Sequence, residues 1–299
     1  EIRIDDEPAP DDTSAAYGIR VRGRFLHIRD GTTFMATDGM TVKIYDDDIF
    51  TDDLLGTTTT DADGIFDVVV DWEAQDGDEY PDLKVVFAAE NDEVRVKPPS
   101  GSRAYTFERG VWTDFTGTDL NLVVVSPDHE VDQAIPHLLT NYTRFWRYLD
   151  DRGHDTRFLE INFPTPDDDG AWYSRTFESI QIPFDNRWSD GTHAHEYGHH
   201  VNYCLAPMPS IDYCNEICDR DYPDDCGHCR WCEEEVNSAW TEGWAQYIAH
   251  VIPPTFDALY GVPAINTREF EDLHPCHIDT LWDDPDSTEG FTGALLVDI

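Results

Sequence analysis

Residues 195–199 form the pattern most able to do chemistry, His195-Glu196-Tyr197-Gly198-His199. This is an H-E-x-x-H box, and on a helix its two histidines lie four residues apart on one face. Two neutral imidazoles placed in this way bind one Zn²⁺. Glu196 follows the first histidine and is placed to take a proton from a water that the ion activates. The box therefore predicts a helix that carries a catalytic zinc site.

A second segment, residues 235–249, has apolar side chains at helical spacing and one acid among small residues. The acid is Glu242, between Ala239 and Ala245. A carboxylate in such surroundings needs a partner, because burial of an unpaired charge is very unfavourable. Zinc would be that partner, and two histidines with one glutamate leave a fourth position open, as catalytic zinc sites do.

The two segments together carry a family resemblance. They contain the runs His195-Glu196-Tyr197-Gly198-His199-His200 and Ala239-Trp240-Thr241-Glu242-Gly243-Trp244-Ala245. These runs resemble the gluzincin group of zinc metallopeptidases, which have the thermolysin-like fold. The resemblance implies that His195, His199 and Glu242 bind zinc and that Glu196 is the general base.

The surrounding sequence extends this resemblance from about residue 121 to residue 299. We expect a helix over 131–149, a strand over 158–163, an edge strand over 179–183 just before the zinc helix, and a later helix over 289–298. The chain departs from the family pattern at Gln246, where an Asp often orients a zinc histidine, and in a cysteine-rich insertion between the ligand helices. His193 and His200 flank the box as surface histidines or as further metal contacts. Tyr247, Tyr260, His274 and His277 are candidates to stabilise the oxyanion.

Upstream of this part, short runs of alternating residues predict a different kind of domain. The runs lie at 19–25, 41–45, 64–70 and 83–88, with turn residues between them. Alternation of period two predicts an antiparallel β-sandwich. Residues 17–122 resemble transthyretin-like and carboxypeptidase-regulatory-like sandwiches, which support or bind, so self-association through this domain is expected.

The expected organisation is therefore multidomain, β followed by α+β. An acidic, flexible lead over 1–16 precedes the sandwich at 17–122, and a zincin-like catalytic domain follows at 123–299 with the cysteine-rich insertion at 204–232.

Loops of the predicted sandwich are dense in carboxylates that would suit calcium, a hard cation that takes oxygen ligands. The acidic residues in these loops are Asp46, Asp47, Asp48, Asp52, Asp53, Asp61 and Asp63. The alternative is a solvated rim on an acidic protein.

The charge of the chain limits its partners. The formal net charge is −42 on 299 residues, and the isoelectric point is about 4.2. Such a surface repels nucleic acid and anionic membranes. No stretch is long and apolar enough to predict a membrane span. The acidity indicates either a high-salt habitat or a cation-rich extracellular setting.

The cysteines predict an oxidising compartment. All but one of the 7 fall in the insertion: Cys204, Cys214, Cys218, Cys226, Cys229 and Cys232, with Cys276 apart. We expect at least two disulfides there, and a second zinc on Cys226, Cys229 and Cys232 is the alternative. An odd number leaves one thiol without a partner in the chain. The chain opens without a signal peptide, consistent with a processed start, and Asn141-Tyr142-Thr143 is a glycosylation sequon within a predicted helix.

These observations predict a secreted zinc metallopeptidase that hydrolyses protein or peptide substrates, as an endopeptidase or an aminopeptidase. The competing hypothesis is a non-catalytic extracellular structural or adhesive subunit, such as a subunit of a polymer, that retains a zincin scaffold. Glu196 favours the enzyme, because a scaffold has no need of a general base.

Overall fold

A computed structural model describes residues 17–29, 31–48, 51–73, 79–126, 129–166, 170–205 and 236–260. Within these ranges the protein is rich in β-sheet and has three α-helices. The predicted lead at 1–16, most of the cysteine-rich insertion and the predicted helix at 289–298 lie outside the described residues.

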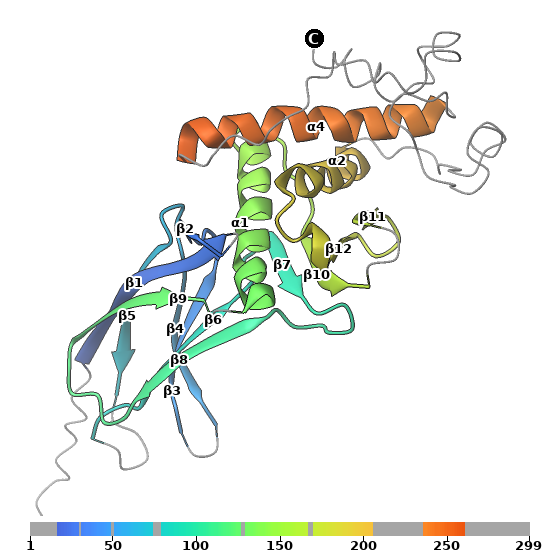
Figure 1. Ribbon diagram of the computed structural model, residues 1–299. Helices are drawn as coiled ribbons and strands as arrows, with labels where there is room; N and C mark the ends of the chain where they lie inside the picture. Colours follow the sequence, from blue (N-terminus) through green and yellow to red (C-terminus); the bar gives the residue numbers. More distant parts are fainter. Residues whose placement is uncertain are drawn as a thin grey trace, which may run out of the picture.

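Two sheets form a sandwich in the first part of the chain (Figure 1). One has the order β2-β1-β5, with β9 also beside β1, and the other has the order β4-β3-β6-β8. The strands of the first sheet are β1 (Tyr17–Arg29), β2 (Thr33–Ala36), β5 (Ile65–Trp72) and β9 (Asp119–Val125). Those of the second are β3 (Thr41–Asp46), β4 (Asp53–Thr59), β6 (Leu83–Ala88) and β8 (Thr106–Trp112).

Apolar and charged residues alternate along β1, and this alternation decides which face of the strand is buried. Ile19 and Val21 are fully buried, whereas Arg20 and Arg22 between and after them face solvent and pair with aspartates of the neighbouring strands. The prediction of an antiparallel sandwich is wrong at one pair, because β9 runs parallel to β1. β9 follows β8, which belongs to the second sheet, and a sequence pattern does not reveal the direction in which the chain returns to the first sheet.

A third sheet combines strands from both parts of the sequence. Its order is β11-β12-β10-β7, from β7 (Val94–Lys97), β10 (Leu159–Thr165), β11 (Trp172–Ser174) and β12 (Ser179–Pro183). β7 lies within the range predicted for the sandwich, yet it pairs in parallel with β10. β12 lies between β10 and β11, so the expected edge strand at 179–183 is an interior strand and β11 has the edge position.

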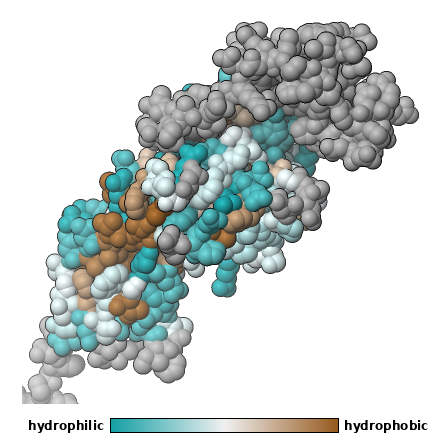
Figure 2. Space-filling view, in the orientation of Figure 1, coloured by the Kyte–Doolittle hydropathy of each residue, from teal (hydrophilic) through white to brown (hydrophobic). Residues whose placement is uncertain are grey.

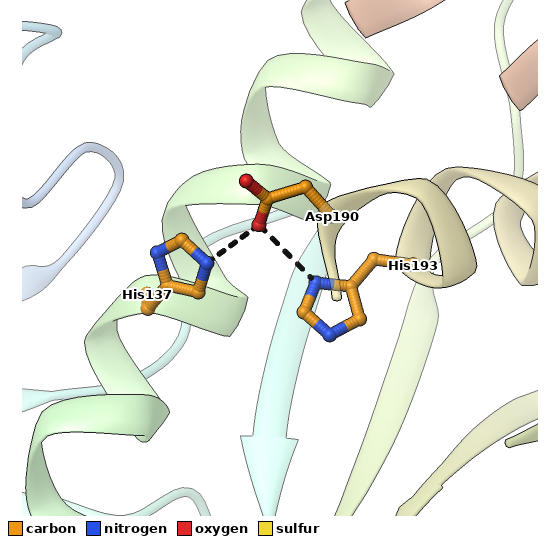
Figure 3. Close-up of side chains that lie close together, drawn as sticks. All are labelled: His137, Asp190 and His193. Atoms are coloured by element: carbon orange, nitrogen blue, oxygen red, sulfur yellow. Dashed lines mark hydrogen bonds and ion pairs between the residues drawn. The ribbon is translucent and has the colours of Figure 1, made fainter. Parts of the chain in front are cut away.

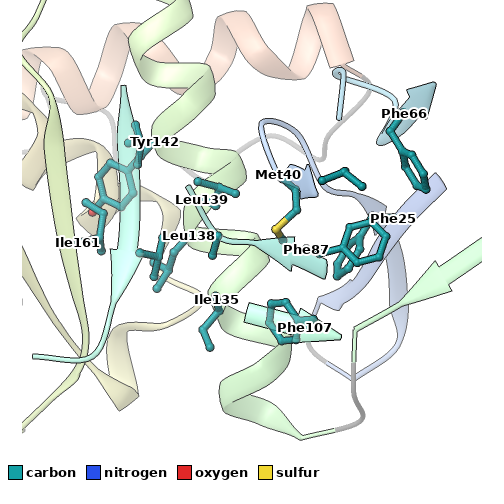
Figure 4. Close-up of a cluster of buried hydrophobic side chains, with 14 of the residues drawn as sticks. Phe25, Met40, Phe66, Phe87, Phe107, Ile135, Leu138, Leu139, Tyr142 and Ile161 are labelled. Carbon is teal, nitrogen blue, oxygen red and sulfur yellow. The ribbon is translucent and has the colours of Figure 1, made fainter. Parts of the chain in front are cut away.

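Helix α1 (Glu130–Asp150) lies between the sandwich and the third sheet (Figure 1). The His129 side chain accepts a hydrogen bond from the Val131 amide and so caps its first turn. Buried side chains of α1 join those of both neighbours in one continuous hydrophobic core. Figure 4 shows Ile135 and Leu138 of α1 between Phe87 of the sandwich and Ile161 of β10. The predicted boundary near residue 122 is therefore crossed by both a shared sheet and a shared core.

Helices α2 (Asp190–Leu205) and α4 (Val236–Tyr260) pack against each other, and η1 (Phe184–Asn186) leads into α2. α4 crosses one end of α1 in Figure 1. None of the helices in the described part of the chain is both long and apolar enough to cross a membrane. Figure 2 shows apolar side chains gathered over the sandwich, whose exposed apolar residues include Leu54, Val69 and Val123.

Candidate metal centre

Three side chains of the predicted zinc site converge between α2 and α4. His195 and His199 lie on the face of α2 that meets α4, because four residues make about one helical turn. Their Nε2 atoms are 3.2 Å apart, and each is 3.2 Å from Oε2 of Glu242 on α4. The three ligand atoms thus form a nearly equilateral triangle.

This triangle has the size that a zinc ion requires. Zinc in a protein is four-coordinate with bonds of about 2.0–2.1 Å, so the ligand atoms of a regular tetrahedron lie ~3.3 Å apart. The observed 3.2 Å separations match three corners of such a tetrahedron. The His195 and His199 side chains keep 14% and 12% of their surface exposed among the described residues, whereas Glu242 keeps 1%. The donor set therefore fits a zinc ion with one further coordination position.

The electrostatics of Glu242 suit a metal ligand. Its side chain is only 1% exposed. Burial alone would raise the pKa of Glu242, but the attraction of His199 and the hydrogen bonds of both imidazoles outweigh burial and hold the pKa well below its usual value. The carboxylate is therefore ionised at the point where the two imidazoles meet.

Glu196 lies beside the triangle on α2 and is itself buried. Its negative charge acts on Tyr142 of α1. Burial, and then this charge, raise the pKa of Tyr142 well above 10. Glu196 is therefore a buried acid that directly follows His195 on the same helix.

A second polar cluster lies on another face of α2 and comes from α1 and α2 (Figure 3). His137 Nε2 donates to Asp190 Oδ1 over 2.7 Å. Asn141 Nδ2 donates to the same oxygen over 2.8 Å and to His193 Nδ1 over 3.0 Å. The His193 Nε2 proton is donated to the Asn186 carbonyl over 2.9 Å.

The ligand-type atoms of His137, Asp190 and His193 lie within 4.8 Å of one another, which is close enough for a shared metal ion. Their spacing is unequal, 2.7 Å from Asp190 to His137 and 3.9 Å from Asp190 to His193, and the Asn141 amide nitrogen lies among them. A metal on His137 Nε2 would also shift the ring proton to Nδ1, which is buried without a hydrogen-bond acceptor in the described structure. The cluster is therefore a hydrogen-bonded network that joins α1 to the first turn of α2.

The sequence predicted that His193 and His200, which flank the zinc box, are surface residues or further metal contacts. Both are fully buried. Burial lowers the pKa of both His193 and His200 to about 4, so both are neutral near pH 7. His200 donates from Nε2 to the Arg157 carbonyl over 3.0 Å. Neither joins the triangle of ligand atoms. The Asn141 side chain of the glycosylation sequon points into the protein, where its Nδ2 donates hydrogen bonds to Asp190 and His193.

The remaining sequence-predicted residues are only partly described. Gln246 lies on α4 one turn after Glu242, and Tyr247 packs against Trp244 with ring centroids 5.9 Å apart. Cys204 is a free thiol at the end of α2, with its sulfur 3.6 Å from His200 Nε2. The other cysteines, His274, His277 and the Tyr260 side chain lie outside the described residues, so the disulfide prediction stays a prediction.

Two carboxylates in the acidic loops of the sandwich flank a lysine. Lys84 Nζ lies 2.8 Å from Asp47 Oδ1 and 2.5 Å from Asp52 Oδ2. Asp46 accepts hydrogen bonds from the Trp72 indole and the Asp82 amide. Asp61 accepts from two amides of its own turn. Among the residues described, these carboxylates do not converge as a group of potential metal ligands, and calcium binding stays a prediction.

Sequence reasoning missed the network of His137, Asn141 and Asp190. The signal available was the spacing of His137 and Asn141, which are polar residues one helical turn apart, in line with Gln133, on a helix that also buries Ile135, Leu138 and Leu139. Asp190 gave no signal of its own, because its partners are remote in sequence.

Comparisons with known proteins do not assign this site. No profile of a known protein family matches the sequence, and no curated protein has a matching sequence. Among solved structures, a 9R-lipoxygenase from Cyanothece PCC8801 is similar over 69% of this chain, with 15% identity and a TM-score of 0.29. The chain spans 28% of that lipoxygenase, and similarity at this level does not establish a shared fold. The chemistry of the site therefore rests on its own geometry.

Proposed function

We propose that the protein is a zinc-dependent metallopeptidase of the gluzincin type, with a zincin-like arrangement of α2, α4 and the third sheet. The observation that carries the proposal is the triangle of His195 Nε2, His199 Nε2 and Glu242 Oε2, with sides of 3.2 Å. A hydrogen-bonded cluster has no need of equal separations, whereas three ligands of one tetrahedral ion do.

The chain supplies the groups that peptide hydrolysis requires. His195, His199 and Glu242 would hold the ion, which when bound lowers the pKa of water and polarises a carbonyl. Glu196 accepts the proton that water loses as it attacks the scissile carbonyl carbon, and then delivers this proton to the leaving amine. Its position directly after His195, on the helix that carries both histidines, supports this role.

The proposal places the protein outside the cell, with a protein or peptide as substrate. This part rests on the cysteine content of the chain and on its net charge of −42. The competing hypothesis, a structural subunit with a retained scaffold, also predicts zinc binding but does not predict hydrolysis.

The test combines metal content with turnover of casein or a peptide library. The wild-type chain, His195→Ala and Glu196→Gln are prepared in parallel, and zinc per chain is measured by mass spectrometry. We expect one zinc at this site in the wild type, its loss in His195→Ala, and zinc without hydrolysis in Glu196→Gln. Hydrolysis that survives in Glu196→Gln excludes this mechanism, and zinc without hydrolysis in the wild type favours the structural subunit.

A further inference from the structure

We infer that Asp190 is a positioning residue for the proposed zinc site, and that Arg29 of the sandwich acts through Asp190 on the helix that carries His195 and His199. The inference rests on the proposed function and deepens it: the sandwich becomes part of what sets metal affinity. Asp190 itself does not touch the ligand atoms.

Both oxygens of the Asp190 carboxylate are held from outside α2. Oδ1 accepts from His137 and Asn141 of α1 over 2.7 and 2.8 Å. Oδ2 pairs with an Arg29 guanidinium nitrogen over 2.5 Å. Asp190 is the first residue of α2 and is 7% exposed, while Arg29 is the last residue of β1 and is 19% exposed. One carboxylate therefore ties the start of the zinc helix to α1 and to the sandwich.

Asn141 of α1 also holds His193, which lies three residues after Asp190 on α2. Asn141 donates to His193 Nδ1 over 3.0 Å, and His193 Nε2 donates to the Asn186 carbonyl over 2.9 Å. His193 precedes His195 by two residues and points to the opposite side of the helix. The rotation of α2 about its axis is thus fixed from the side facing away from the ligands.

Rotation matters because the third ligand is on another helix. His195 and His199 move together with α2, but Glu242 belongs to α4, which Asp190 does not contact through any hydrogen bond or ion pair described for the structure. A metal site tolerates errors of about 0.5 Å in its ligands. A small turn of α2 would change both 3.2 Å distances to Glu242 and weaken zinc binding without removal of any ligand.

Charge adds to the argument. Asp190 is buried, and its partners on α1 are neutral when the His137 ring carries one proton. Arg29 brings a full positive charge, so a loss of Arg29 leaves a buried carboxylate with neutral donors alone. We expect the first turn of α2 to shift in response, which would displace His195.

The experiment uses the full chain and compares two arginine–aspartate pairs that share strand β1. The test variants are Arg29→Met and Asp190→Asn. The matched controls are Arg22→Met and Asp119→Asn, which break an ion pair of 2.9 Å that is 41% and 43% exposed. Zinc affinity is measured by competition with a chelator, and the visible absorption of the Co²⁺-substituted protein reports the ligand geometry.

We expect the test variants to bind zinc about tenfold more weakly, the lower end of what the loss of supporting interactions costs a metal site. Their Co²⁺ spectra should change, while those of the controls should match the wild type. Urea unfolding of the zinc-free chains shows which variants are folded. Arg29→Lys keeps the positive charge and should restore most of the affinity if Arg29→Met fails to fold.

The outcomes separate this inference from the proposed function. If the wild type binds zinc and both test variants bind it equally tightly with an unchanged Co²⁺ spectrum, Asp190 is only structural and the inference fails alone. If the wild type does not bind zinc through His195, the proposed function fails and the inference falls with it. A second zinc in the wild type that is lost in His137→Gln would replace the hydrogen-bonded network with a metal site and overturn the inference.

Discussion

Gly198 of α2 lies directly against Ala245 of α4. A Cβ atom on Gly198 would be 2.7 Å from the Ala245 Cα, 3.1 Å from its carbonyl oxygen and 3.2 Å from its Cβ. Contacts this short with backbone atoms cannot be relieved by a side-chain rotation. The glycine inside the H-E-x-x-H box therefore sets how closely α4, with Glu242, approaches the two histidines.

Gly198→Ala should consequently weaken zinc binding, although it changes no ligand. The added methyl group must push α4 away from α2 by several tenths of an ångström, which is enough to disturb a site with a tolerance of about 0.5 Å. We expect at least a tenfold loss of zinc affinity in a chelator competition. Gly18→Ala is the control, because its Cβ would meet only side-chain atoms, Val69 at 3.3 Å and Asp71 at 3.8 Å. Equal zinc affinity in Gly198→Ala and wild type would show that α4 does not depend on this contact.

The elements around the site could largely be predicted from the sequence, because their signals are local. The apolar spacing of 131–149 predicted α1, which spans Glu130–Asp150, and the run at 179–183 matches β12. The box spacing predicted that His195 and His199 share one helix face, since four residues make one turn of any α-helix. Glu242 was singled out because an acid among small apolar residues requires a partner.

What escaped prediction depends on contacts between segments remote in sequence. β7 has only four residues, and nothing in them distinguishes a sandwich strand from a partner of β10. The parallel course of β9 beside β1 depends on how the chain returns after β8. Asp190 has partners on β1 and α1 that lie far before it in the chain. Local patterns carry no information on such pairings.

Acid should destabilise the zinc-free protein because His27 is buried in its neutral form. His27 is fully buried on β1, and burial, followed by repulsion from His137 and nearby arginines, holds its pKa well below 6.5. The unfolded chain binds the proton first, so this contribution to stability is complete above pH ~6.5 and is lost as the pH falls below that value. Each such histidine adds a slope of about 1.4 kcal/mol per pH unit in this window.

Urea unfolding of the zinc-free chain at several pH values tests this expectation. His27→Gln should lower the dependence of the unfolding free energy on pH by the equivalent of about one bound proton. Glutamine keeps a partner for the Thr37 hydroxyl, which lies 2.9 Å from His27 Nδ1. The metal-free form is used because protonation of the zinc ligands would otherwise add its own pH dependence. A variant with the wild-type slope would assign the acid sensitivity to other groups.

Calcium should have little effect on the sandwich while Lys84 is present. Its ammonium group lies between Asp47 and Asp52, and the hydrogen bond from Lys84 lowers the pKa of the Asp47 carboxyl. In Lys84→Met the two carboxylates lose this counter-charge and repel each other, so a hard cation becomes their best partner. We expect calcium at constant ionic strength to raise the melting temperature of Lys84→Met but not that of the wild type. A calcium-dependent rise in the wild type would instead support the original prediction of a native calcium site in these loops.

Asp38 should be essential for the packing of the sandwich against α1. Its carboxylate is fully buried and accepts hydrogen bonds of 2.6 and 3.0 Å from the two terminal nitrogens of Arg147 on α1. Asp38→Asn removes the negative charge that faces this guanidinium and the buried Arg144, whose Nε lies 3.8 Å from Asp38 Oδ2, and we expect a loss of about 2–3 kcal/mol in the free energy of unfolding. Asp67→Asn, which breaks the exposed pair with Arg20, is the control and should have little effect.

The form of the unfolding curve is the more informative measurement. Because the core runs from the sandwich through α1 into the third sheet, the zinc-free protein should unfold in one cooperative transition, and Asp38→Asn should shift that whole transition. Calorimetry together with fluorescence of the tryptophans in both parts follows the two ends of the molecule at once. Two separate transitions, with only the first shifted by Asp38→Asn, would mean that the sandwich and the zinc-binding part fold independently. In that case Arg29 could not act on the zinc helix through Asp190, since an independently folding sandwich would leave the metal affinity unchanged when it melts.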